Sequence, residues 1–73
     1  MSASGWYHLD NCRMVFEGPK SFKVITGDGR QLFIPFSQLH PDQMPDGDEP
    51  LEVGDKDRTV TITAWLAEQE GLI

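Results

Sequence analysis

Residues 20–36 read KSFKVITGDGRQLFIPF, and this stretch decides the fold. Two runs rich in branched and aromatic residues, 21–26 and 31–34, flank the sequence GDGR at 27–30, a pattern typical of a β-hairpin. A type I′ turn centred on Asp28-Gly29 needs positive φ at both positions, and these two residue types accept it. The same glycines lack the Lys-Ser/Thr and helix of a phosphate-binding loop, so we interpret them as a hairpin turn.

The turn also fixes which strand residues face each other, because pairing runs outward from it. A turn centred on Asp28-Gly29 predicts four cross-strand pairs: Ile25 with Leu32, Lys23 with Ile34, Val24 with Phe33, and Phe22 with Pro35. Both faces of the hairpin are then partly apolar, so we expect it to be central, with its faces covered by other elements. Pro35 lacks a backbone donor and predicts a strand end or an edge position.

Upstream of the hairpin, the sequence predicts two short strands, 6–9 and 12–17, joined by a tight turn at Asp10-Asn11. Residues 1–5 are expected to form a loose start. Neighbours in a strand point to opposite faces, so Trp6 and Tyr7 would divide between core and surface. An exposed member of this pair would be a candidate anchor for a partner.

Downstream of the hairpin, residues 37–40 predict one short helical turn before Pro41. Residues 59–63 alternate between threonine and branched apolar residues, which indicates a half-buried strand. Thr63 then has the side chain of a helix cap, and Gly71 suits the left-handed residue after a helix over 64–70. So short a helix is not stable by itself, and we expect Trp65 and Leu66 to dock it on the sheet.

These elements predict one α+β domain over residues 1–73, a small twisted sheet of four or five mostly antiparallel strands with one short C-terminal helix. A half-closed barrel is one arrangement of such a sheet. A single cysteine in 73 residues allows no intrachain disulfide. With no apolar run long enough for a signal or a membrane span, we expect a cytoplasmic protein without membrane contact.

Residues 42–57, DQMPDGDEPLEVGDKD, hold most of the charge. Residues 1–41 carry three acids and four bases, and residues 42–73 carry nine acids and two bases, so the halves net +1 and −7. Prolines and glycines predict an irregular loop over 40–57, tacked to the body by Met44, Leu51 and Val53. As residues that contact a partner we predict Asp42, Asp46, Asp48, Glu49, Glu52, Asp55, Asp57, Trp6 and Tyr7. The alternative is a loop that only keeps the protein soluble.

No catalytic or metal site follows from the sequence. A calcium loop beginning at Asp46 would need an oxygen ligand at Pro50 and glycine at Leu51, so that pattern fails. His8, Cys12 and His40 lack a fourth ligand for zinc. We therefore expect a protein that is not an enzyme and that uses no cofactor or metal.

Four segments give the chain a resemblance to a family of small uncharacterised proteins of bacteriophages and mobile elements. They are VITGDG at 24–29, FIPFSQL at 33–39, EVGD at 52–55 and WLAEQEGLI at 65–73. Residues 1–19 and the longer proline-rich loop depart from the family's pattern. The resemblance implies a phage accessory protein of the kind that blocks host machinery, and it transfers no catalytic residue.

The leading hypothesis is a non-enzymatic binding protein whose acidic surface occupies a basic surface of a host protein in the host cytoplasm. The nucleic-acid groove of a defence complex is such a surface, so an anti-CRISPR or anti-restriction inhibitor would fit. One alternative is a structural or oligomerising accessory protein, with a sheet edge or Trp6-Tyr7 as its interface. Another is a weak nucleic-acid binder through Lys20, Lys23 and Arg30, which the acidic pI near 4.5 disfavours. The sequence leaves the oligomeric state open.

Overall fold

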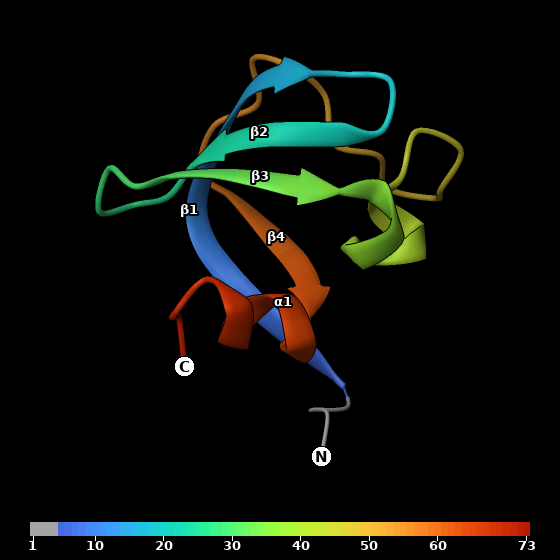
Figure 1. The fold of residues 1–73 in the computed structure, drawn as a ribbon. Coiled ribbons are helices and arrows are strands. Elements are labelled where there is room, and N and C mark those ends of the chain that lie inside the picture. The colour runs from blue at the N-terminus through green and yellow to red at the C-terminus, as the bar shows by residue number, and fades with distance from the viewer. Residues whose placement is uncertain (1–4) are drawn as a thin grey trace.

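The computed structural model describes residues 5–73 as one open antiparallel sheet with a short C-terminal helix (Figure 1). The strands lie in the order β3-β2-β1-β4. In chain order the elements are β1 (Trp6–Glu17), β2 (Ser21–Ile25), β3 (Gln31–Pro35), the 3-10 turns η1 (Phe36–Gln38) and η2 (Pro41–Gln43), β4 (Arg58–Thr63) and α1 (Ala64–Gln69). The predicted α+β class, the antiparallel sheet and the C-terminal helix are confirmed. Of the predicted loose segment 1–5, only Gly5 belongs to the described residues.

The first strand is longer than predicted and runs through the middle of the sheet. Its first half pairs with β4 and its second half with β2, so the prediction of two strands joined by a turn is wrong. Asp10-Asn11 instead forms a β-bulge, because β1 has one more residue than β4 between the pairs Leu9–Val60 and Cys12–Arg58. Asn11 has a φ of 57°, a conformation that asparagine tolerates. The bulge bends β1 so that its two halves serve two different partners.

The hairpin register differs by one residue from the prediction. Val24 pairs with Leu32 and Lys23 with Phe33. The cause is a three-residue loop: the Gly29 N–H donates to the Thr26 carbonyl at 2.9 Å and Gly29 has a φ of 91°, the geometry of a type I turn with a bulge rather than of a type I′ turn.

This shift places all the large buried side chains of the hairpin on one face. Phe22, Val24, Leu32 and Ile34 are each at most 3% exposed. The opposite face is not covered, since Phe33 is 60% exposed, which overturns the expectation that both faces would be. β2 is an inner strand, and β3 is an edge strand that ends at Pro35, as that residue predicted.

The core is shared by the sheet, by α1 and by the segment after β3. Its buried members are Leu9, Cys12, Met14, Phe22, Val24, Leu32, Ile34, Leu39, Leu51, Val60, Ile62, Leu66 and Ala67. They come from every strand, from the helix and from the 42–57 connection. A 73-residue domain depends on such shared packing, because no single pair of elements buries enough apolar surface.

The helix ends are built as predicted, but its buried face is not. The Thr63 hydroxyl accepts from the Leu66 N–H at 3.2 Å, and Gly71 has a φ of 72° after the helix. Leu66 and Ala67 face the core, whereas Trp65 is 44% exposed, so the prediction that Trp65 docks the helix is wrong. Neighbouring side chains of a helix point about 100° apart. Since Leu66 faces the sheet, the adjacent Trp65 points away from it. No helix among residues 5–73 is long and apolar enough to cross a membrane.

The acidic connection follows the body of the protein closely. Leu51 is 2% exposed and Met44 packs on the core, as predicted, but Val53 is 56% exposed, against the prediction. From η2 the chain passes behind the hairpin to the far end of β1 (Figure 1). There the Gly54 N–H donates to the Met14 carbonyl at 2.9 Å, and the Met14 N–H donates to the Asp55 carbonyl at 3.0 Å. The connection thus bonds to the same edge of β1 as β4 does, just before β4 begins at Arg58.

Candidate binding surface

Two acids of the 42–57 connection are brought together by its backbone. The Glu49 N–H donates to the Asp42 carbonyl at 2.8 Å. Gly47 allows this close fold, because a Cβ at that position would lie 2.4 Å from the carbonyl oxygens of residues 41 and 42. Seven residues apart in sequence, Asp42 and Glu49 therefore sit on one side of a tight loop.

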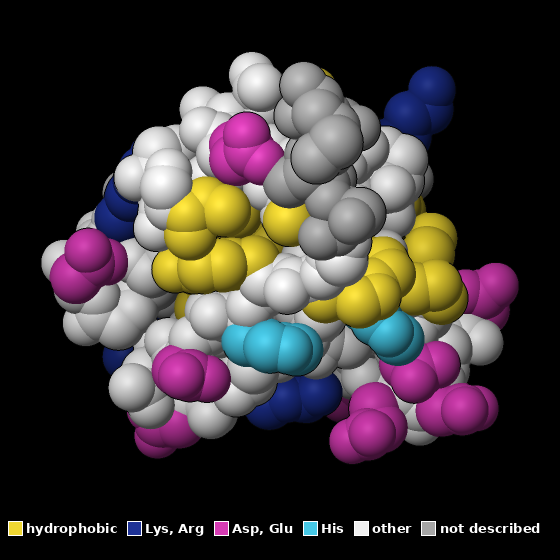
Figure 2. Space-filling view, turned by 90° about the horizontal axis from the view of Figure 1, so that it is seen from below, with side chains coloured by type: hydrophobic (Ala, Val, Ile, Leu, Met, Phe, Trp, Pro, Cys, Tyr) yellow, Lys and Arg dark blue, Asp and Glu magenta, His cyan; other side chains and the backbone are white. Residues whose placement is uncertain are grey.

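This loop forms one wall of a surface hollow of about 220 Å³ beside the start of β1. We call it the Trp6 hollow. Its lining residues come from three parts of the chain: Trp6 and His8 from β1, Thr61 from β4, and His40, Asp42, Gln43 and Glu49 from the connection. Figure 2 shows both histidine side chains on one face, next to hydrophobic side chains, with acidic side chains around them.

The aromatic wall of the hollow is a pair of rings. The centroids of the Trp6 and His40 rings are 4.6 Å apart, with their planes tilted by 56°. Trp6 remains 46% exposed, so part of its ring is available to a partner. The His40 Nδ1 accepts from the Asp42 N–H at 3.1 Å, which holds the imidazole against the loop.

Polar contacts to β4 fix the floor of the hollow. The Gln43 Oε1 accepts from the Thr61 N–H at 2.7 Å, and the Gln43 Nε2 donates to the Thr59 carbonyl at 2.7 Å. The His40 N–H donates to the Thr61 carbonyl at 3.0 Å, and the His8 Nδ1 lies 3.0 Å from the Thr61 hydroxyl. The wall is therefore tied to the sheet along its length, and the hollow is already formed without a partner.

The remaining acids predicted to contact a partner lie outside the hollow. Asp46 and Asp48 are exposed at the tip of the loop. The Asp55 carboxylate accepts from the Arg58 guanidinium at 2.6 Å and from the Glu52 N–H at 3.1 Å. Asp57 lines a separate hollow. The structure thus divides the acidic stretch. Asp42 and Glu49 line the Trp6 hollow, the Asp55 carboxylate is paired within the protein, and the other four acids, Asp46, Asp48, Glu52 and Asp57, are exposed elsewhere on the surface.

Tyr7 and Trp6 point to opposite faces of β1, as neighbours in a strand should. Tyr7 packs against the core and its hydroxyl donates to the Leu72 carbonyl at 3.3 Å. Of the pair, only Trp6 belongs to the exposed surface. Trp6 and His8 share a face because they lie two residues apart in one strand, whereas the approach of His40 and Thr61 depends on the tertiary fold.

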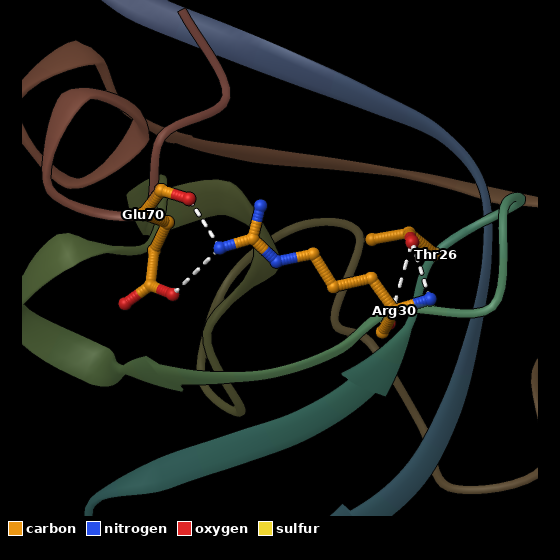
Figure 3. Close-up of polar contacts among 3 residues, drawn as sticks. All are labelled: Thr26, Arg30 and Glu70. Atoms are coloured by element: carbon orange, nitrogen blue, oxygen red, sulfur yellow. Dashed lines mark hydrogen bonds and ion pairs between the residues drawn. The ribbon is translucent and has the colours of Figure 1, made fainter.

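One predicted nucleic-acid contact is already engaged within the protein (Figure 3). The Arg30 guanidinium donates to the carbonyl of Glu70 and lies 3.5 Å from its carboxylate. Glu70 caps the C-terminus of α1, where a cation is favourable. In the same turn, hydrogen bonds from the Thr26 hydroxyl and then from the Arg30 N–H lower the pKa of Asp28. The hairpin turn is therefore tied to the end of the helix.

Cys12 is a core residue. Its side chain is fully buried in the core, and its thiol donates to the Leu9 carbonyl at 3.5 Å. Burial, followed by the nearby Asp10 carboxylate, raises the pKa of the thiol. Within residues 5–73 no three His, Cys, Asp or Glu side chains are placed to hold a metal ion.

No protein-family model matches the sequence, and no curated protein or solved structure matches it. The resemblance to phage and mobile-element proteins therefore stays a prediction.

Proposed function

We propose that this protein is a non-enzymatic binding protein that occupies a basic surface of a partner macromolecule. One observation carries the proposal: the half-exposed Trp6 ring shares a hollow with the Asp42 and Glu49 carboxylates. A tryptophan face beside two carboxylates suits a cationic side chain, above all the planar guanidinium of arginine.

The rest of the acidic stretch would act at longer range. Residues 42–57 hold seven acids against Lys56, and Asp46 and Asp48 project from the loop tip next to the hollow. A concentrated negative field of this kind raises the rate at which a basic surface is met, and salt weakens it. Trp6 would then make the direct contact with the partner, and the acids at the loop tip, Asp46 and Asp48, would attract its basic surface.

The class of partner follows from the resemblance to phage accessory proteins. Host defence complexes bind nucleic acid in basic grooves, and an acidic protein that fills such a groove would block them. We therefore infer an inhibitor of the anti-CRISPR or anti-restriction kind, acting in the host cytoplasm. Expressed in a host with a restriction or CRISPR system, it should restore plating of a sensitive phage, and the variant Asp42→Asn with Glu49→Gln should reduce that effect.

A labelled arginine-rich peptide tests the chemistry of the hollow directly. Fluorescence anisotropy should show binding that weakens as salt is raised. Trp6→Ala should weaken it by about two- to fivefold, the range of an exposed cation–π contact. Asp42→Asn with Glu49→Gln should weaken it by about two- to tenfold, as for a pair of rim charges.

Trp65→Ala is the matched control, because Trp65 is exposed to nearly the same degree as Trp6, 44% against 46%, and is not in the hollow. This variant should bind the peptide like the unmodified protein. Affinity that does not respond to salt, or that falls equally in the two tryptophan variants, would contradict the proposal.

A further inference from the structure

The outer face of β1, β2 and β3 carries an unusual row of side chains. Phe16 pairs with Lys23, and Lys23 pairs with Phe33, so the three lie side by side across the strands. Phe16 is 53% exposed and Phe33 is 60% exposed. The Lys23 ammonium lies 5.6 Å from the centre of the Phe33 ring. Two large rings thus stand on the uncovered side of the sheet, on either side of a base.

The next row on the same face leads into a basic hollow. Ile25 lies two residues after Lys23 on β2 and pairs with Arg13 of β1. Arg13, Ile25 and Lys56 line a hollow of about 390 Å³, together with the backbone of the hairpin turn. Asp57 lines it as well, so two bases meet one acid there. Row and hollow form one continuous surface, which we call the outer face.

Part of the acidic connection reaches this end of β1, since the Met14 N–H donates to the Asp55 carbonyl at 3.0 Å. The Asp55 carboxylate there accepts from the Arg58 guanidinium at 2.6 Å. At physiological ionic strength charges are screened over about 8 Å, so the charges of the outer face itself matter most for a ligand on it. These are Arg13, Lys23 and Lys56 against Asp57, a local excess of positive charge on a protein whose net charge is −6.

We propose that the outer face binds single-stranded nucleic acid. Unpaired bases would stack on Phe16 and Phe33, and phosphates would lie against Lys23 and in the hollow of Arg13 and Lys56. Exposed aromatic rings alternating with basic side chains on an open sheet suit this ligand, because every nucleobase offers a ring face and every phosphodiester linkage carries a negative charge. An acidic protein would pair with the basic side chains but would leave the two phenylalanine rings without planar groups to stack on them.

A labelled oligothymidylate of about 12 nucleotides tests the proposal by fluorescence anisotropy at low salt. Phe16→Ala and Phe33→Ala remove exposed rings, so both variants should keep the fold, as circular dichroism would verify. Each should weaken binding by about five- to hundredfold, the range for loss of one stacked base. Lys23→Gln should weaken binding and reduce the salt dependence by about one phosphate contact.

Trp65→Ala is the aromatic control, and Trp6→Ala tests whether the oligonucleotide binds in the Trp6 hollow instead of on the outer face. Both variants should bind the oligonucleotide like the unmodified protein. A duplex of the same length should bind more weakly, since its bases are not free to stack. No binding at low salt, equal binding of the duplex, or unchanged affinity in both phenylalanine variants would each overturn the proposal. So would a dimer in light scattering that Phe33→Ala dissociates, because the face would then belong to a second copy.

Discussion

Leu51→Ala is the most informative change in this protein, because it asks whether the acidic connection is part of the folded body. Leu51 is 2% exposed and belongs to the core cluster. It is the only buried side chain between residues 42 and 57. Removing it should free the connection from the sheet while leaving every acid in place.

The size of the effect follows from the burial. Leu→Ala deletes three carbons at about 0.8 kcal/mol each, or about 2.4 kcal/mol, and the remaining cavity raises the loss to about 3 kcal/mol. A domain of 73 residues has a free energy of unfolding of roughly 4–11 kcal/mol. The variant should therefore lose a large share of its stability and melt about 12–24 °C lower.

Thermal and urea unfolding, followed by circular dichroism, would measure this loss. Val53→Ala is the matched control, since Val53 belongs to the same connection and is 56% exposed, and it should change stability by less than about 0.5 kcal/mol. Amide exchange of Gly54, whose N–H donates to the Met14 carbonyl, should accelerate in Leu51→Ala. Equal and small losses in the two variants, with no change in exchange at Gly54, would refute the reasoning.

Three further predictions concern single sites. Gly47→Ala should cost about 1–3 kcal/mol by urea unfolding, because its Cβ would meet the carbonyl oxygens of residues 41–42; an unchanged midpoint would show that the loop opens freely. Thr63→Ala should lower the free energy of unfolding by about 1 kcal/mol through loss of the helix cap. Thr59→Ala, on an exposed part of β4, should change it by less than about 0.5 kcal/mol, and equal losses in the two variants would contradict the role of the cap. Cys12 should resist iodoacetamide at mildly alkaline pH and react once urea unfolds the chain, since burial raises the pKa of its thiol and disfavours the reactive thiolate; rapid labelling of the folded protein would disprove this.

Features that depend on local chemistry could be predicted from the sequence. The hairpin, the strand before Thr63, the cap itself and Gly71 after the helix all rest on a few neighbouring residues. The hairpin register could not be predicted, because an Asp28-Gly29 sequence fits both a two-residue turn and a three-residue loop with Gly29 left-handed. That one-residue difference decides whether Phe33 is buried or exposed, and so decides whether the outer face exists.

Features that depend on contacts between residues far apart in the chain could not be predicted from the sequence, for a different reason. The bulge at Asp10-Asn11 resembles a turn until it is known that β4 pairs with the first half of β1 and β2 with the second. Trp6 was identified as a candidate anchor, but its neighbour His40 is 34 residues away in sequence. The sequence predicts that Trp65 and Leu66 both dock the helix, but a short helix packs on the sheet with one side only, and Leu66 is 6% exposed whereas Trp65 is 44% exposed.

The central position of β1 has a consequence for the order in which the chain folds. Trp6 pairs with Thr63 and Leu9 with Val60, so the first half of β1 cannot form its strand pairs until β4 is present. Contacts across so many residues are slow to form, and during synthesis β1 presents an unpaired edge until residues 58–63 have left the ribosome. The bulge at Asp10-Asn11 interrupts that edge, which makes premature pairing with another chain less favourable.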